Sequence, residues 1–151
     1  MADAQSHARV LLVGLGRQGR RHLRVAAMSA RGDVVATVDP HADGVEGVPH
    51  HRTIAEAVEA GGPVDAAVVA TPATDHLHSA GDLLERGIPT LVEKPMAFDL
   101  DQGRRLLEVA RRTGTLLAVG HVERFNPCVQ LVSALLDGGT LGAPVAMSFR
   151  R

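Results

Sequence analysis

A run of glycines near the start of the chain limits what the sequence can fold into. Residues 9–13 are almost entirely apolar, and they lead directly into Gly14, Gly16 and Gly19. In this G-x-G-x-x-G spacing the first glycine permits a tight turn and the second lets the backbone approach a pyrophosphate. The third allows a helix to pack closely on the strand. The sequence therefore predicts a strand, a phosphate-binding turn and a helix, in that order.

An acidic residue follows at the distance that a dinucleotide site requires. The apolar run 33–38 ends in Asp39, 20 residues beyond Gly19, where a carboxylate accepts hydrogen bonds from an adenosine ribose. The negative charge of Asp39 disfavours a 2′-phosphate, so NAD is the expected cofactor. NADP is the alternative, because arginines at 17, 20 and 21 could reach that phosphate or could equally form a solvated helix face. The expected cofactor residues of this part are Gly14, Leu15, Gly16, Arg17, Gln18, Gly19 and Asp39.

Composition excludes several classes of protein. The chain has 151 residues, of which 45% are hydrophobic, and a net charge of −1. That charge does not favour nucleic acid or an anionic membrane as a partner. No apolar run approaches the roughly 20 residues of a membrane-spanning helix. The single cysteine, Cys128, suits a reducing compartment. We therefore expect a cytoplasmic protein.

Strands and helices are expected to alternate along the chain. Apolar runs rich in valine, leucine and alanine lack strict alternation, as is typical of parallel strands buried on both faces. Amphipathic helices are expected between them, the last around 126–137, so the pattern predicts a Rossmann-type doubly wound parallel sheet over residues 8–142. The candidate strands are 9–14, 33–38, 65–70, 89–93, 115–120 and 144–149.

The last of these candidate strands differs from the others. Val145, Met147 and Phe149 alternate with small or charged residues, as in a half-buried antiparallel strand. We interpret residues 143–151 as the first strand of a second domain that the chain does not complete. Its pairing partner is expected to be that missing substrate domain or a second copy in a homo-oligomer.

Polar and titratable residues follow the expected strands. Ligands of open α/β sheets bind beyond the carboxyl ends of the strands, so these residues are candidates for chemistry. Read singly, each also has a structural interpretation: a solvated loop lysine, a first-turn surface histidine, or a buried structural histidine. The candidates are Thr71, Pro72, His76, Glu93, Lys94, His121 and Arg124.

The eight histidines do not indicate a metal site. His50 and His51 are adjacent, and His76 and His78 are two residues apart. Neither spacing places two ligands on one helix face, and there is no cysteine cluster beside them. No metal is expected.

Several motifs follow one another along the chain: GxGxxG, Asp39, T-P-x-x-x-H, E-K-P and G-H-x-x-R-F-N-P. In this order they resemble the nucleotide-binding half of the Gfo/Idh/MocA oxidoreductases. The resemblance covers residues 8–151. It implies an NAD(P)-dependent enzyme acting on the hydroxyl or ketone of a sugar, a nucleotide sugar or a cyclitol. Residues 120–127 further resemble members that act as UDP-N-acetylglucosamine 3-dehydrogenases.

The resemblance also implies roles for single residues. Lys94 matches the family's catalytic lysine, which hydrogen-bonds the reacting oxygen, and the adjacent Glu93 helps hold Lys94 or the nicotinamide. Pro95 is expected to follow a cis bond, as in relatives. Glu93 and Lys94 are also expected to contact the cofactor, as are the cofactor-lining residues Thr71, Pro72 and His76. The substrate-side matches are His121 and Arg124.

Two functions follow from these expectations. Relatives carry a second domain with substrate contacts and a further acid–base residue, so the first hypothesis is a truncated sugar oxidoreductase. The alternative is a stand-alone NAD-binding module, acting as a sensor, a docking subunit or an inactive remnant.

Overall fold

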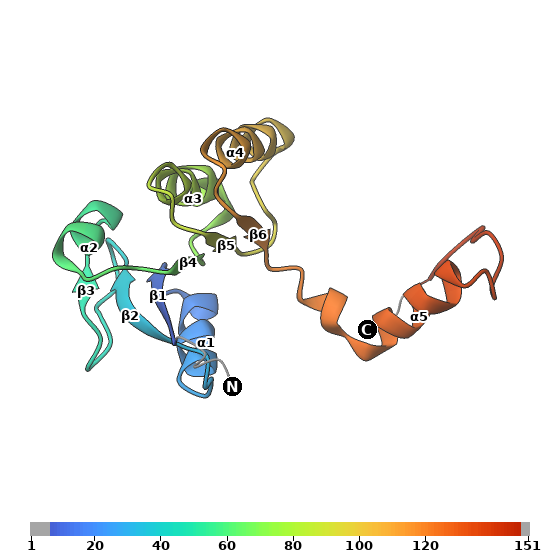
Figure 1. Ribbon diagram of the computed structural model, residues 1–151, viewed down its shortest axis with the longest axis horizontal. Coiled ribbons are helices and arrows are strands. Elements are labelled where there is room, and N and C mark those ends of the chain that lie inside the picture. Colours follow the sequence, from blue (N-terminus) through green and yellow to red (C-terminus); the bar gives the residue numbers. More distant parts are fainter. Residues whose placement is uncertain (1–6, 149–151) are drawn as a thin grey trace, which may run out of the picture. The chain divides into compact units, whose positions relative to one another are not determined.

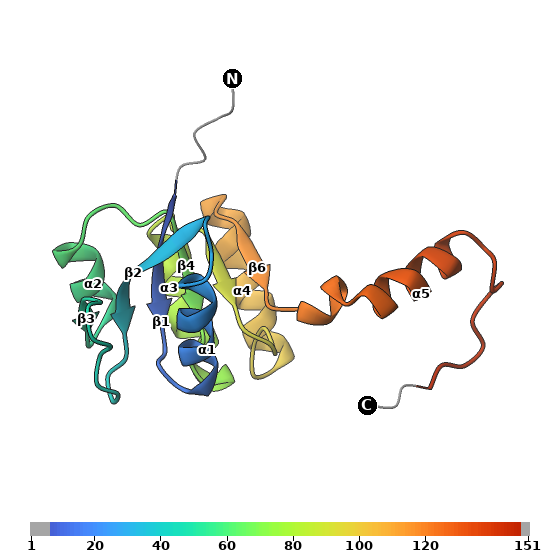
Figure 2. The same cartoon turned by 90° about the horizontal axis from the view of Figure 1, so that it is seen from below.

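The structure, a computed structural model, describes residues 7–148. Its centre is a six-stranded parallel sheet in the order β3-β2-β1-β4-β5-β6 (Figures 1 and 2). This order confirms the predicted doubly wound sheet, because it reverses between β1 and β4. The strands are β1 Ala8–Val13, β2 Gly32–Val38, β3 His50–His51, β4 Ala66–Val69, β5 Thr90–Val92 and β6 Leu117–Val119.

Helices cover the sheet on both faces. Helix α1 lies on one face, and α2, α3 and α4 lie on the other (Figure 1). The main core is between the sheet and these three helices, where Leu11, Val69, Leu83 and Leu106 are fully buried. The bounds are α1 Arg17–Ala26, α2 Ile54–Ala60, η1 Ala73–Asp75, α3 His76–Glu85 and α4 Leu100–Thr113.

Side chains fix where two of these helices begin. The Thr53 hydroxyl accepts a hydrogen bond from the Glu56 amide at 3.2 Å and caps α2. Asp99 accepts from the Gln102 amide at 2.8 Å and caps α4. Each cap satisfies an amide that the first helical turn leaves without a partner. Within residues 7–148, no helix is long and apolar enough to span a membrane.

Strand β3 is an element that the sequence did not predict. It has two residues, too few for a periodic pattern, and it forms because β2 offers a free edge. The Thr37 amide donates to the Pro49 carbonyl at 2.9 Å, and the Asp39 amide donates to the His51 carbonyl at 3.1 Å. The strand therefore extends the sheet beside the end of β2.

Residues 121–151 form a second compact unit, distinct from residues 1–120. It contains η2 Val122–Phe125 and α5 Pro127–Asp137, which Asn126 caps by accepting from the Cys128 amide at 3.0 Å. The strand expected over 144–149 is not formed by residues 144–148, and Phe149 lies outside the described residues. A strand needs backbone partners, and the described part of this unit contains no other strand. The expected domain boundary between 142 and 143 falls inside this unit.

Candidate cofactor site

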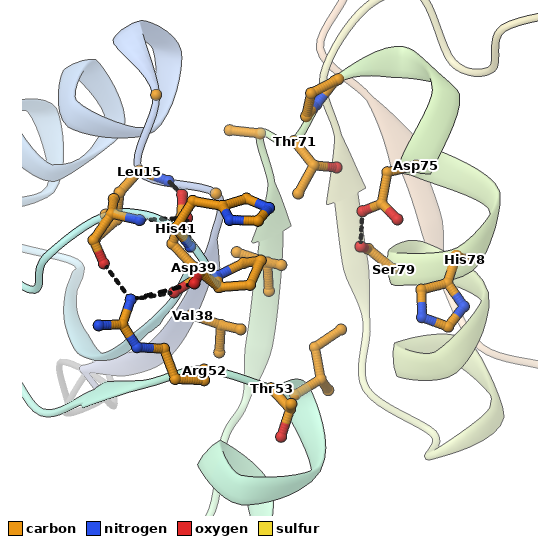
Figure 3. A pocket seen from close by; sticks show the side chains of 18 of the residues that line it. Leu15, Val38, Asp39, His41, Arg52, Thr53, Thr71, Asp75, His78 and Ser79 are labelled. Atoms are coloured by element: carbon orange, nitrogen blue, oxygen red, sulfur yellow. Dashed lines mark hydrogen bonds between the residues drawn. The ribbon is translucent and has the colours of Figure 1, made fainter.

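A pocket of about 1190 Å³ opens at the carboxyl ends of β1, β2 and β4. This is the place where the strand order reverses, and open α/β sheets bind their ligands there. Figure 3 shows two walls, with Asp39, His41 and Arg52 on one side and Asp75, Ser79 and His78 on the other. The glycine turn that follows β1 lines the pocket as well.

The three glycines of the turn stand in different surroundings. Gly14 has a φ of +95°, and a Cβ there would lie 2.7 Å from the Ala70 carbonyl carbon. A Cβ on Gly19 would lie 1.8 Å from the Gly14 oxygen, so the helix packs directly on the turn. A Cβ on Gly16 would meet no atom within 4 Å. Gly14 and Gly19 are therefore required by the fold, whereas Gly16 faces open space in the pocket.

Two further observations fit a dinucleotide at this pocket. Gly16 is the N-cap of α1, no side chain caps this helix end, and its first turn holds no acidic residue. The first amides of a helix favour an anion such as a pyrophosphate. The hydroxyl of Thr71, which also lines the pocket, is buried and has no hydrogen-bond partner among the described residues. A bound ribose or phosphate would supply that partner.

Asp39 lies at the end of β2, as predicted, and its carboxylate organises the neighbouring backbone. It accepts from the Leu15 amide at 2.8 Å, the His41 amide at 2.8 Å and the Ala42 amide at 2.9 Å. Desolvation, the largest single influence, raises the pKa of Asp39, but the three backbone N–H groups together outweigh it and lower the pKa below 3.8. Since a carboxylate offers about four lone pairs, it can still accept from a ribose hydroxyl.

Because the folded-state pKa of Asp39 is lowered, its carboxylate stabilises the fold at pH values above the unfolded pKa of 3.8. That stability is lost as the pH falls through the folded-state pKa. We expect Asp39→Asn to make unfolding less dependent on pH between neutral and acidic buffer, by on the order of 0.5 kcal/mol after solvent screening. Urea unfolding of both proteins at several pH values measures this. Equal pH dependence in the two proteins would contradict the assigned bonds.

Arg52 is a pocket residue that the sequence reasoning missed, since no motif contains it. It stands between β3 and α2, and its Nη1 donates to the Ala42 carbonyl at 2.8 Å and the Pro40 carbonyl at 3.3 Å. Arg52 therefore fixes the loop whose amides bind Asp39. On the opposite wall, the Ser79 hydroxyl donates to Asp75 (Figure 3).

Glu93 and Lys94 follow β5, and the Lys94–Pro95 bond is cis, as the resemblance implied. Lys94 is the only lysine of the sequence, a signal that the sequence reasoning did not use. Its side chain is exposed and makes no ion pair with any residue in the range 7–148. The ammonium group of Lys94 is thus open to a ligand, but neither Glu93 nor Lys94 lines the pocket, so their contact with a cofactor stays a prediction.

Glu93, by contrast, is 8% exposed and has a partner that the sequence reasoning missed. Its Oε1 lies 2.9 Å from the Nε2 of His22, which α1 carries three residues after Gly19. Its Oε2 accepts from the Lys94 amide at 3.1 Å. The glycine-motif helix and the end of β5 are joined through this carboxylate.

His76 occupies a different place from the cofactor contact that was expected. The residue is 1% exposed and is absent from the pocket lining. Its Nδ1 lies 2.9 Å from the Pro95 carbonyl oxygen and its Nε2 lies 3.0 Å from the Thr71 carbonyl oxygen. The ring is occupied in joining two loops, so its geometry favours a structural role. Thr71 and Pro72, in contrast, line the pocket as expected.

The expected substrate-side residues lie in the second unit. His121 precedes η2 and Arg124 belongs to it, with the Arg124 amide donating to the His121 carbonyl at 3.1 Å. Their approach to a substrate stays a prediction. Across the described part of the chain, no group of three histidine, cysteine, aspartate or glutamate side chains could hold a metal ion.

Comparison with known proteins agrees with this geometry. A family model described as "Oxidoreductase family, NAD-binding Rossmann fold" (GFO_IDH_MocA) matches residues 8–121. The rhizopine catabolism protein MocA of Rhizobium meliloti is 33% identical over 94% of this chain and 50% of its own length. An inositol 2-dehydrogenase of Streptomyces avermitilis is 33% identical over 91% of this chain and 43% of its own length.

A solved structure is similar to the same part of this chain. The WlbA dehydrogenase from Bordetella pertussis, crystallised with NADH and UDP-GlcNAcA, superposes with a TM-score of 0.83 at 29% identity. The match covers 90% of this chain and 41% of that one. The chain thus spans about half the length, or less, of the relatives it matches.

Proposed function

We propose, from the premise that this chain belongs to the Gfo/Idh/MocA oxidoreductase family, that residues 8–120 bind NAD for a dehydrogenase. The substrate class that we propose is a sugar, a nucleotide sugar or a cyclitol with a hydroxyl group that is interconverted with a ketone. The named relatives include an inositol 2-dehydrogenase and a dehydrogenase crystallised with UDP-GlcNAcA. A cytoplasmic location, suggested by the single cysteine, belongs to the same proposal.

One observation carries the cofactor assignment. Gly16 presents its backbone to open space at the uncapped end of α1, in the pocket that is also lined by the Thr71 hydroxyl, for which residues 7–148 offer no hydrogen-bond partner. We assign the pyrophosphate to the turn and the first turn of α1, and the adenosine ribose to Asp39. Thr71 and Pro72 would then contact the cofactor where it crosses the end of β4. The residues of the turn are Gly14, Leu15, Gly16, Arg17, Gln18 and Gly19.

Lys94 is the residue that we assign to catalysis. Bound NAD supplies the carbon that accepts or returns a hydride. The exposed ammonium of Lys94 can donate a hydrogen bond to the substrate oxygen and stabilise the negative charge that develops there. Glu93 does not face the substrate directly in this assignment, because its carboxylate is already engaged by His22 and by the Lys94 amide.

Calorimetric titration of the 151-residue chain with NADH and with NADPH tests the cofactor assignment. We expect NADH to bind more tightly, because Asp39 accepts ribose hydroxyls and repels a 2′-phosphate. A folded sample that binds neither dinucleotide would overturn the proposal. Binding without turnover of any cyclitol or nucleotide sugar would favour the alternative of a binding module.

A further inference from the structure

We infer that His22 is a positioning residue for Lys94, acting through the buried carboxylate of Glu93. The inference deepens the proposed function, since it rests on Lys94 as the group that meets the substrate oxygen. It concerns a histidine that belongs to the glycine-motif helix and not to the segment that carries the lysine.

The first step is the burial of Glu93. A carboxylate withdrawn from water is costly unless it is paired and hydrogen-bonded. Glu93 satisfies this condition at both oxygens. Its Oε1 lies 2.9 Å from the Nε2 of His22, and its Oε2 accepts from the Lys94 amide at 3.1 Å. Gly120 closes another side, because a Cβ there would lie 3.4 Å from Oε2. The carboxylate thus sits between α1, the Lys94 backbone and the end of β6.

The second step concerns the other side of Lys94. The carbonyl of the next residue, Pro95, lies 2.9 Å from the ring of His76, which is 1% exposed and also contacts the Thr71 carbonyl. This anchor is made by α3 and does not involve His22. Replacing His22 therefore weakens only the contact that precedes Lys94, and residues 94–95 stay attached to the fold through His76.

The third step is what these bonds do for the side chain of Lys94. The ammonium has no ion pair of its own in residues 7–148, so the backbone position of Lys94 sets the region that the ammonium can reach. A catalytic group is effective only when its geometry is held by surrounding contacts. By holding the Lys94 amide, Glu93 thus positions the start of a side chain that has no ion pair of its own among the described residues.

A purely structural role is the competing interpretation, in which the His22–Glu93 pair stabilises the domain and leaves Lys94 unaffected. The two interpretations differ in the folded state. Only the positioning role requires the hydrogen bond of the Lys94 amide to weaken when His22 is replaced. A structural role would change the unfolding midpoint alone.

The composition of the chain provides a direct probe. Because Lys94 is the only lysine, growth with ¹⁵N-lysine gives a protein with a single labelled backbone amide. In His22→Ala we expect that amide signal to shift and its hydrogen exchange to become about 10-fold faster, as its charged acceptor loses its other partner. His22→Gln places an amide nitrogen near the position of the ring Nε2 and is expected to restore the wild-type shift and exchange rate.

His7→Ala is the matched control. It removes a histidine whose ring lies 3.0 Å from Asp33 in an exposed pair at the start of β1, the opposite end of the sheet. It should leave the Lys94 amide unchanged, and urea unfolding of all variants separates local from global effects. A folded His22→Ala protein with an unaltered Lys94 amide would overturn the inference, as would failure of His22→Gln to restore the signal.

Failure of this inference is distinct from failure of the proposed function. The amide signal is recorded without cofactor or substrate, whereas the proposed function is tested by NADH binding. A chain that binds no NADH but responds to His22→Ala as expected would retain the positioning contact and lose the proposed role of Lys94.

Discussion

Gly16→Ala is expected to weaken NADH binding about 10- to 100-fold, because in the proposed assignment the new methyl group stands where the pyrophosphate approaches the backbone. The fold tolerates the change. The new Cβ would meet no protein atom within 4 Å, and φ at this position is −64°, which alanine adopts freely. Stability should fall only by the cost of a poorer N-cap, about 0.5–1 kcal/mol. Calorimetry and urea unfolding measure the two effects separately.

Two other glycines make this experiment specific. Gly62→Ala adds the same methyl group in open space away from the pocket and should leave NADH affinity unaltered. Gly19→Ala is expected to behave in the opposite way. Its Cβ would lie 1.8 Å from the Gly14 oxygen, so the turn must open at a cost of about 3 kcal/mol in stability. Gly16→Ala with unchanged NADH affinity would show that the pyrophosphate does not lie on this turn.

The sheet was predictable because its strands are buried on both faces. The runs around β1, β2, β4, β5 and β6 are continuous and apolar, and such runs are a local property of the sequence. Strand β3 is different, because His50 and His51 are held beside β2 by backbone pairing and by a contact of 3.0 Å between the Thr37 hydroxyl and the His50 ring. Its existence depends on a neighbouring edge that no local pattern can reveal. The expected C-terminal strand depends on a neighbour in the same way: residues 144–148 alternate correctly but have no described strand beside them, so its pairing stays a prediction.

The residues of the candidate site also differ in whether a local pattern could identify them. The glycines and Asp39 were found because their chemistry demands fixed spacings along the chain. His22 and Arg52 were missed because they act across elements. The His22 ring contacts Glu93, which does belong to a motif, and joins α1 to the end of β5, while Arg52 joins the end of β3 to the loop after β2.

His76 shows what a motif leaves open. Its motif suggested a ligand, but whether a histidine ring faces a pocket or two carbonyl oxygens depends on the packing of α3 against the ends of β4 and β5. That packing is a tertiary property, so the motif alone could not distinguish the two roles.

Lys94→Met is expected to lower kcat of the complete enzyme by about 10² to 10³ while leaving NADH affinity nearly unchanged. Methionine keeps an unbranched apolar chain and removes the ammonium, so the reacting oxygen would lose the donor that we propose for its negative charge. The backbone contacts that Glu93 and His76 make with this segment do not involve the side chain of Lys94. The fold and the cofactor pocket should therefore persist.

Arg104→Met supplies the control for loss of a cation. Among the described residues, Arg104 forms an exposed ion pair with Asp101 at 3.4 Å on α4, and such pairs contribute little. Steady-state turnover with NAD and the substrate of the wild-type enzyme, together with NADH titration, distinguishes three roles. Loss of turnover at constant NADH affinity makes Lys94 the oxyanion donor. Loss of NADH affinity makes it a cofactor contact instead, and loss of neither contradicts its assignment to the site. Within these 151 residues no second lysine side chain can replace the one removed.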